Sequence, residues 1–223
     1  MKTSFNHSVA PNSIHQNALE RYEPTEEQPW NLQRVWTLHR RSCYGATWNE
    51  LQRDLTDGPE KSIDRILNGS VRASGLPENY DEMRNVLGAA AVTSKRPERL
   101  IAWWIYQMYF SRDPLRERLC TMWHNHFATS NSKVNQLEWM HAQNEAFREL
   151  GSGEFNALLT KTVTQPAMLK WLDGDKNRLG KPNENLGREF LELFTLGVGN
   201  YTEQDVKEAS RALTGWTLSL IHI

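Results

Sequence analysis

The chain has 223 residues, of which 39% are hydrophobic and 24% charged, and its formal net charge is -1. These values are typical of a soluble globular protein and exclude a strong overall field that would steer the chain to nucleic acid or an anionic membrane. Its two cysteines, Cys43 and Cys120, exclude a disulfide-rich secreted scaffold. The longest apolar run, 100–110, is too short to span a bilayer, and no secretory signal is visible, so the sequence as written predicts a cytoplasmic protein.

Residues 1–28 are polar and lack periodicity, which predicts a mobile leader. From Trp30 onward, apolar residues recur at helical spacing, prolines stand at first-turn positions and glycines at helix ends. Helices are expected at 30–41, from a capping box at 47–50, and at 59–69, 79–92, 97–110, 114–127, 136–150, 166–172, 185–196 and 203–214.

No segment alternates with period two for long enough to predict a strand. We therefore expect an all-α, multi-helix globular domain of roughly eight to ten helices over residues 29–217. Residues 218–223, LSLIHI, resemble the translation of a sequencing adapter and are expected to be an artefact, the alternative being a short apolar final strand.

Five motifs point to a known family: LHRR at 38–41, PLRER at 114–118, WHNHFATS at 123–130, PNENLGREFLELFTLGVGNYTE at 182–203 and RALTGW at 211–216. Together they resemble the bacterial domain-of-unknown-function 1800 family, in its planctomycete-like variant. Gly187 departs from the family pattern, which usually has alanine there. Family members are much longer, so the resemblance implies an N-terminal portion that is truncated at its C-terminus.

The resemblance implies no established reaction and no assigned catalytic residues. Many relatives look exported and lie beside genes for sulfatase-like secreted proteins. The resemblance therefore implies export as an alternative to the cytoplasm, and a sulfatase-like protein as a partner.

WHNHF raises the question of a metal site, because His124 and His126 are both ligand types. On one helix, His126 falls among Leu115, Leu119 and Trp123, whereas His124 falls nearly opposite, near Glu117 and Cys120. Both can bind one divalent metal only if the helix ends near His124. The alternative is a buried His126 that a backbone or carboxylate group satisfies.

Glu189 is the second candidate, because it flanks the expected core stripe of the 185–196 helix, formed by Leu186, Phe190, Leu193 and Phe194. A carboxylate there needs a partner or its pKa rises. It could act as a general base, ligate a metal with His126 and His124, or form a buried ion pair. Glu192 lies four residues after Arg188, a spacing typical of a surface ion pair.

Asp173, Asp175, Asn177 and Glu184 occupy positions one, three, five and twelve of a calcium loop of the EF-hand type. Arg178 replaces the glycine that such a loop needs at position six. The alternative is a hydrogen-bonded polar connection closed by Asx-turns. The adjacent Trp103 and Trp104 are expected in the core rather than as a sugar platform.

These candidate residues leave two alternative functions open. The first is a metal-dependent hydrolase or oxidoreductase, with His126 and Glu189 as catalytic residues in a pocket between the WHNHF and PNEN helices. The second is a non-catalytic helical module that binds a partner protein or a polysaccharide. The enzyme requires His126 and Glu189 to converge at a cleft, whereas the module requires exposed tryptophans elsewhere.

Overall fold

The computed structural model describes residues 21–71 and 77–218. Within these ranges the chain forms twelve α-helices, and its only bridge of the β type pairs Arg178 with Lys181, which confirms the all-α prediction. Residues 1–20 of the predicted leader and 219–223 of the predicted artefact lie outside the described ranges. The elements are α1 (Leu32–Ser42), α2 (Trp48–Asp57), α3 (Pro59–Leu67), α4 (Tyr80–Thr93), α5 (Pro97–Phe110), α6 (Pro114–His126), α7 (Asn131–Val134), α8 (Leu137–Leu150), α9 (Phe155–Val163), α10 (Pro166–Trp171), the 3-10 turn η2 (Gly174–Lys176), α11 (Asn185–Glu189), the π-helix η3 (Phe190–Thr195) and α12 (Glu203–Ala212).

Local capping explains where the helices begin. At α2, the Thr47 hydroxyl accepts from Glu50 N and the Glu50 carboxylate accepts from Thr47 N at 2.7 Å, which satisfies two otherwise unpaired backbone donors. At α6, Pro114 occupies the first turn and the Asp113 carboxylate accepts from Arg116 N at 3.0 Å. These starts agree with the predicted ones.

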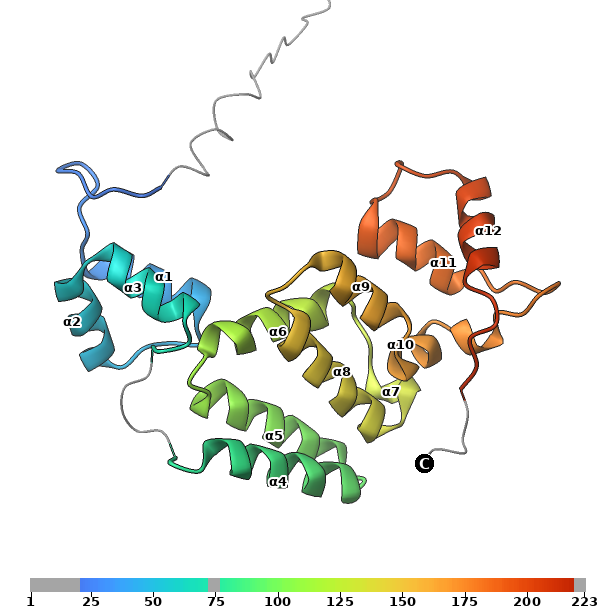
Figure 1. Cartoon of the computed structure of the whole chain (residues 1–223), viewed down its shortest axis with the longest axis horizontal. Helices are drawn as coiled ribbons and strands as arrows, with labels where there is room; N and C mark the ends of the chain where they lie inside the picture. Colours follow the sequence, from blue (N-terminus) through green and yellow to red (C-terminus); the bar gives the residue numbers. More distant parts are fainter. Residues whose placement is uncertain (1–20, 72–76, 219–223) are drawn as a thin grey trace, which may run out of the picture.

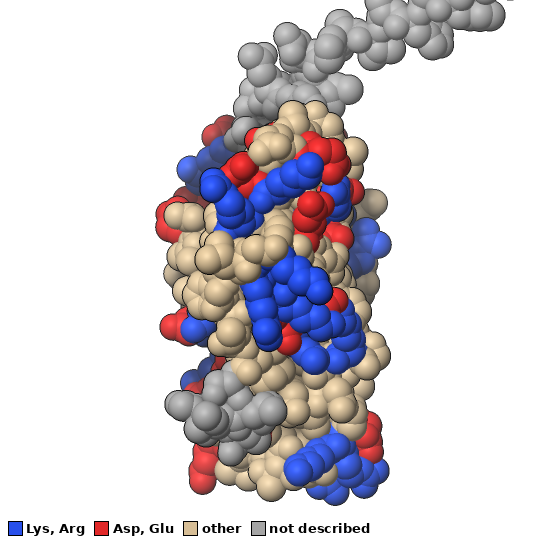
Figure 2. Space-filling view, turned by 90° about the vertical axis from the view of Figure 1, so that its right-hand side faces the viewer, with Lys and Arg blue, Asp and Glu red and all other residues tan. Residues whose placement is uncertain are grey.

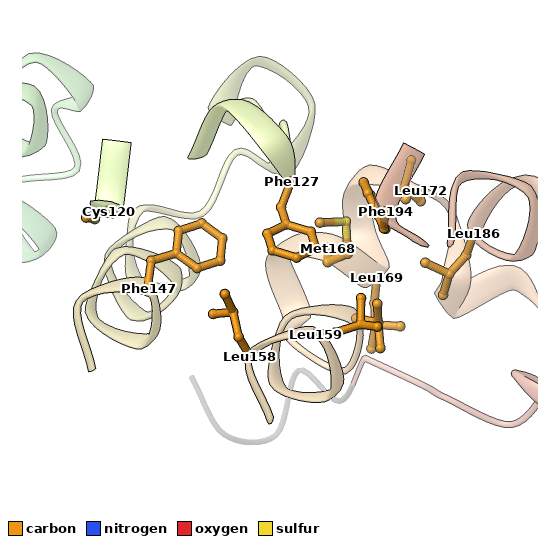
Figure 3. Packing of buried hydrophobic residues seen from close by; sticks show 11 residues of the cluster. Cys120, Phe127, Phe147, Leu158, Leu159, Met168, Leu169, Leu172, Leu186 and Phe194 are labelled. Carbon is orange, nitrogen blue, oxygen red and sulfur yellow. The ribbon is translucent and has the colours of Figure 1, made fainter. Parts of the chain in front are cut away.

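The helices follow one another along the molecule in chain order, from α1–α3 at one end to α11 and α12 at the other (Figure 1). The main core lies between α6, α8, α9, α10, α11 and η3, where Phe127, Phe147, Met168 and Leu186 are fully buried (Figure 3). A smaller cluster, centred on Cys43 and Ile66, joins α1–α3 to Leu115 of α6. In the described parts of the chain, no helix combines the length and the apolar character needed to cross a membrane.

The short elements α7 and η2 were not predicted, and two longer elements also differ from the sequence prediction. Helix α9 was not predicted, yet Leu158, Leu159 and Val163 place it in the main core. The predicted 185–196 helix changes to π geometry at Phe190, where Leu196 N donates to Leu191 O at 2.8 Å. The wider turn keeps Phe194 in the core but leaves Leu193 57% exposed, so the predicted core stripe is wrong at Leu193.

Candidate functional site

The two WHNHF histidines lie in the last turn of α6 and point to different surroundings. The ring of His124 lies between Trp104 and Phe147, with centroids 4.5 and 4.8 Å away. The ring of His126 instead packs against Phe127 and Phe194, at 4.6 and 6.3 Å. The helix continues through both residues, so the early helix end that would let them share a metal is not present.

The most buried side chains of α6 lie outside the predicted stripe, although Leu115 and Trp123 of that stripe still pack against the two apolar clusters. Glu117 and Cys120 are fully buried and His124 is half-buried, whereas His126 is exposed. The expectation of a buried His126 is therefore wrong. The physical reason is that Arg148 of α8 meets Glu117 inside the fold, so a carboxylate replaces an apolar side chain on the buried face.

His124 is held as a neutral imidazole. Its Nε2 accepts a hydrogen bond from Asn144 Nδ2 at 3.1 Å. Burial lowers the pKa of His124 to about 4, because the surrounding rings cannot solvate an imidazolium. At neutral pH this side chain is therefore an uncharged hydrogen-bonding group, and the same neutral form is the one that ligates metals.

His124 lines a cavity of about 320 Å³ between α5, α6 and the α7–α8 region. Among the described residues, no side chain with a formal charge lines it. The lining residues are Pro97, Leu100, Ile101, Trp103, Trp104, His124, Asn125, Thr129, Asn131, Leu137, Met140 and Asn144. Its wall is thus mainly apolar and carries a few neutral polar groups, a composition typical of small-molecule sites.

Several polar atoms of the lining residues have no partner in the described part of the chain. These are Trp104 Nε1, Asn131 Oδ1 and Asn144 Oδ1, all of them buried. They are one donor and two acceptors with almost no accessible surface, so a ligand in the cavity could bond to them only after the lining side chains move. Trp103 is 3% exposed and belongs to the core as predicted, whereas Trp104 and Asn144 were not proposed as site residues. The sequence signal for Trp104 is the pair of adjacent tryptophans on an apolar helix. The pair alone does not show that Trp103 is buried whereas Trp104 is only partly buried.

His126 and Glu189 lie on adjoining elements but do not bond to each other. Nε2 of His126 lies 3.4 Å from the Phe194 carbonyl of η3, a long hydrogen bond. Glu189 is half-buried and makes no side-chain hydrogen bond within the described ranges. Burial and the nearby Glu192 carboxylate raise the pKa of Glu189, and Arg188 partly opposes this.

The charged side chains next to Glu189 in the sequence bind other partners. Glu192 accepts a short hydrogen bond from the Tyr201 hydroxyl, not an ion pair from Arg188 as its spacing predicted. The Arg188 guanidinium instead binds Glu203 at 2.8 Å and Glu184 at 3.3 Å. Glu189 is therefore the carboxylate of this helix that keeps its oxygens available.

Three of the four calcium-loop candidates bind separate partners. Asp173 accepts from Lys133 and Lys176 at 2.8 and 2.6 Å, and these lysines lower its pKa. The buried Asn177 amide donates to Ser210 O at 2.7 Å, and its oxygen accepts from Asn183 N at 3.0 Å.

Of the other two candidates, Glu184 pairs with Arg188, and Asp175 Oδ1 is buried without a partner in the described structure. Across residues 21–71 and 77–218, no group of three or more His, Cys, Asp or Glu side chains is placed to hold a metal ion. Neither proposed ligand set is therefore preassembled in this conformation.

Two buried ionic contacts were not predicted. His39 Nε2 lies 2.7 Å from Asp54 Oδ2, with both side chains fully buried, and Arg65 also binds Asp54. Glu117, 0% exposed, accepts from Arg148 at 2.6 and 2.9 Å. The polar motifs LHRR and PLRER thus place one side chain each inside the fold, where His39 joins α1 to α2 and Glu117 joins α6 to α8.

The fold and site define an all-helical domain with an uncharged cavity between α5, α6 and α8. Residues 37–220 match the model of the DUF1800 family, described as proteins of unknown function, and the chain belongs to this family. Neither the curated proteins nor the solved structures contain a match.

Proposed function

We propose that this domain is a binding module whose site is the cavity lined by His124. The observation that carries the proposal is an uncharged, mainly apolar cavity, three of whose lining residues have a buried polar atom without a partner in the described chain: Trp104 Nε1, Asn131 Oδ1 and Asn144 Oδ1. Buried polar groups are costly unless they find partners. A ligand that offers both hydroxyl groups and an apolar face meets this requirement.

The ligand class is an uncharged one, and a sugar unit of a neutral polysaccharide fits best. Amide, imidazole and indole N–H groups pair with hydroxyls, while the apolar wall covers the C–H face of a sugar ring. An anionic ligand would find no cation among the lining residues, and it would lose its hydration without compensation.

Affinity electrophoresis of the 223-residue chain in gels that contain neutral polysaccharides tests the proposal. Asn125 lines the cavity but is exposed, so Asn125→Ala should leave the fold intact and weaken binding about three- to ten-fold, the value of one hydrogen bond. His124→Leu should weaken binding at least as much.

Trp48→Ala is the matched control, because Trp48 is 61% exposed on α2 and does not line the cavity. Its binding should equal that of the wild type. If Trp48→Ala loses binding while Asn125→Ala keeps it, the exposed tryptophans form the site and the cavity proposal is wrong.

A second candidate, the metal-dependent hydrolase or oxidoreductase, is supported by one observation. The Glu189 side chain forms no hydrogen bond with a described residue, and its pKa is raised by burial and by Glu192, as for a carboxylate available for proton transfer or metal binding. His126 contacts η3, the element that follows Glu189, through the Phe194 carbonyl.

Elemental analysis of chain purified without chelator tests this candidate. Stoichiometric divalent metal that is lost in both His126→Ala and Glu189→Ala would support a metal centre between α6 and the end of α11. Leu193→Ala, at an exposed position of η3, should keep the metal. Absence of metal from the wild-type protein would reject the candidate.

A further inference from the structure

A hairpin at one end of the molecule combines exposed cations with an exposed apolar tip. Arg178 and Lys181 pair across it, with Lys181 N donating to Arg178 O at 3.0 Å. Gly180 closes the turn with a φ of 79°, a conformation that favours glycine. Leu179, at the tip, is 89% exposed, the highest value among the large hydrophobic side chains described. Figure 1 shows this hairpin, between α10 and α11, projecting beyond the helices around it.

The hairpin is firmly attached at its base. The Asn177 amide donates to Ser210 O of α12, and Asn177 O accepts from Gly215 N at 3.3 Å. The second contact brings the segment after α12 to the hairpin, so Trp216, 43% exposed, belongs to the same end of the molecule. The tip is therefore presented on a fixed support.

The charges at this end are not all neutralised. Lys176 binds Asp173 and Arg211 binds Glu208, whereas Arg178 and Lys181 form no ion pair with a described residue. In Figure 2, which faces this end, Lys and Arg side chains gather near the middle of the surface. The overall charge of -1 thus conceals a local excess of positive charge around an apolar tip.

We infer that this hairpin docks the domain on an anionic lipid surface. Leu179 enters the boundary between headgroups and acyl chains, Arg178 and Lys181 contact anionic headgroups, and Trp216 lies at the interface, a position that indole side chains favour. The exposed leucine favours a membrane over a soluble polyanion, because a polyanion offers nothing to cover an apolar tip. This inference is independent of the cavity proposed above.

Co-sedimentation of the 223-residue chain with vesicles provides the test. The chain should bind vesicles of phosphatidylcholine and phosphatidylglycerol, but not vesicles of phosphatidylcholine alone, and added salt should weaken the binding. Leu179→Asn and the single changes Arg178→Gln and Lys181→Gln should each lower the partition coefficient about five-fold.

Matched controls come from the opposite end of the molecule, where Leu67 of α3 is 65% exposed and Lys61 is exposed. Leu67→Asn and Lys61→Gln should bind the mixed vesicles as the wild type does. Absence of binding to mixed vesicles would overturn the inference. Two other results would also overturn it. If Leu179→Asn bound both heparin and mixed vesicles as the wild type does, the surface would recognise charge alone. If Leu67→Asn lost as much vesicle binding as Leu179→Asn, the hairpin would not be the site.

Discussion

Replacing Glu117 by leucine tests how the ion pair between α6 and α8 contributes to stability. The Glu117 side chain is 0% exposed and that of Arg148 is 11% exposed, and the two share three hydrogen bonds of 2.6–3.2 Å. In Glu117→Leu the guanidinium stays buried, with Glu145 at 3.8 Å as its remaining acidic neighbour. Removing one member of a buried pair leaves an uncompensated charge, which costs about 3–5 kcal/mol.

Two further variants separate charge from packing. Glu117→Leu combined with Arg148→Met removes both charges and should recover to within about 1 kcal/mol of the wild type, because apolar side chains of similar size can replace a buried pair. Glu203→Leu is the control, since Glu203 and Arg188 form an exposed pair with side chains 70% and 35% exposed. It should lower the free energy of unfolding far less than Glu117→Leu does, because water screens an exposed pair.

Urea unfolding followed by circular dichroism measures these differences as free energies of unfolding, with the slope compared among variants. The reasoning is refuted if Glu117→Leu loses no more stability than Glu203→Leu. It is also refuted if the double variant is as unstable as the single one, because leucine itself would then be the cause.

Two other predictions concern the histidine cavity and the contact between α11 and α12. The pKa of His124 is depressed from 6.5 to about 4, so between these pH values the unfolded chain binds a proton that the folded chain does not. The free energy of unfolding should therefore fall on acidification from pH 6.5 toward 4, by at most about 1.4 kcal/mol per pH unit. Urea midpoints measured across this pH range should lose this dependence in His124→Phe. A Cβ on Gly187 would lie 3.2 Å from Ser210 Cα and closer still to its hydroxyl, so Gly187→Ala should destabilise the chain by about 1–3 kcal/mol, and thermal unfolding should show partial recovery when Ser210→Gly is added.

Features that depend on residues close together in the sequence were predicted well. The starts of the helices at Pro97 and Pro114 and the all-α class follow from capping, proline placement and periodicity, which are local. Helix α9 escaped prediction because its threonines and Val163 have low helix propensity, and the burial of Leu158 and Leu159 in the core outweighs that preference.

The site depends on contacts that no local pattern contains. Glu117 is buried because Arg148, 31 residues later, meets it, and a helical projection of α6 alone assigns the wrong face. The π geometry of η3 likewise moves Leu193 out of the predicted stripe. The cavity of His124 needs α5, α6 and α8 together, so its unpartnered polar atoms become visible only in three dimensions.

The succession of helices along the molecule in chain order has a consequence for synthesis on the ribosome (Figure 1). Helices α1–α3 can form the His39–Asp54 contact as soon as Arg65 has emerged, before α4 exists. The α4–α5 pair can form next, and α6 then needs α8, synthesised shortly afterwards, to supply Arg148. Because several of the main helix pairs, α1–α2, α2–α3, α4–α5 and α11–α12, are consecutive in the chain, much of their apolar surface meets its partner soon after synthesis.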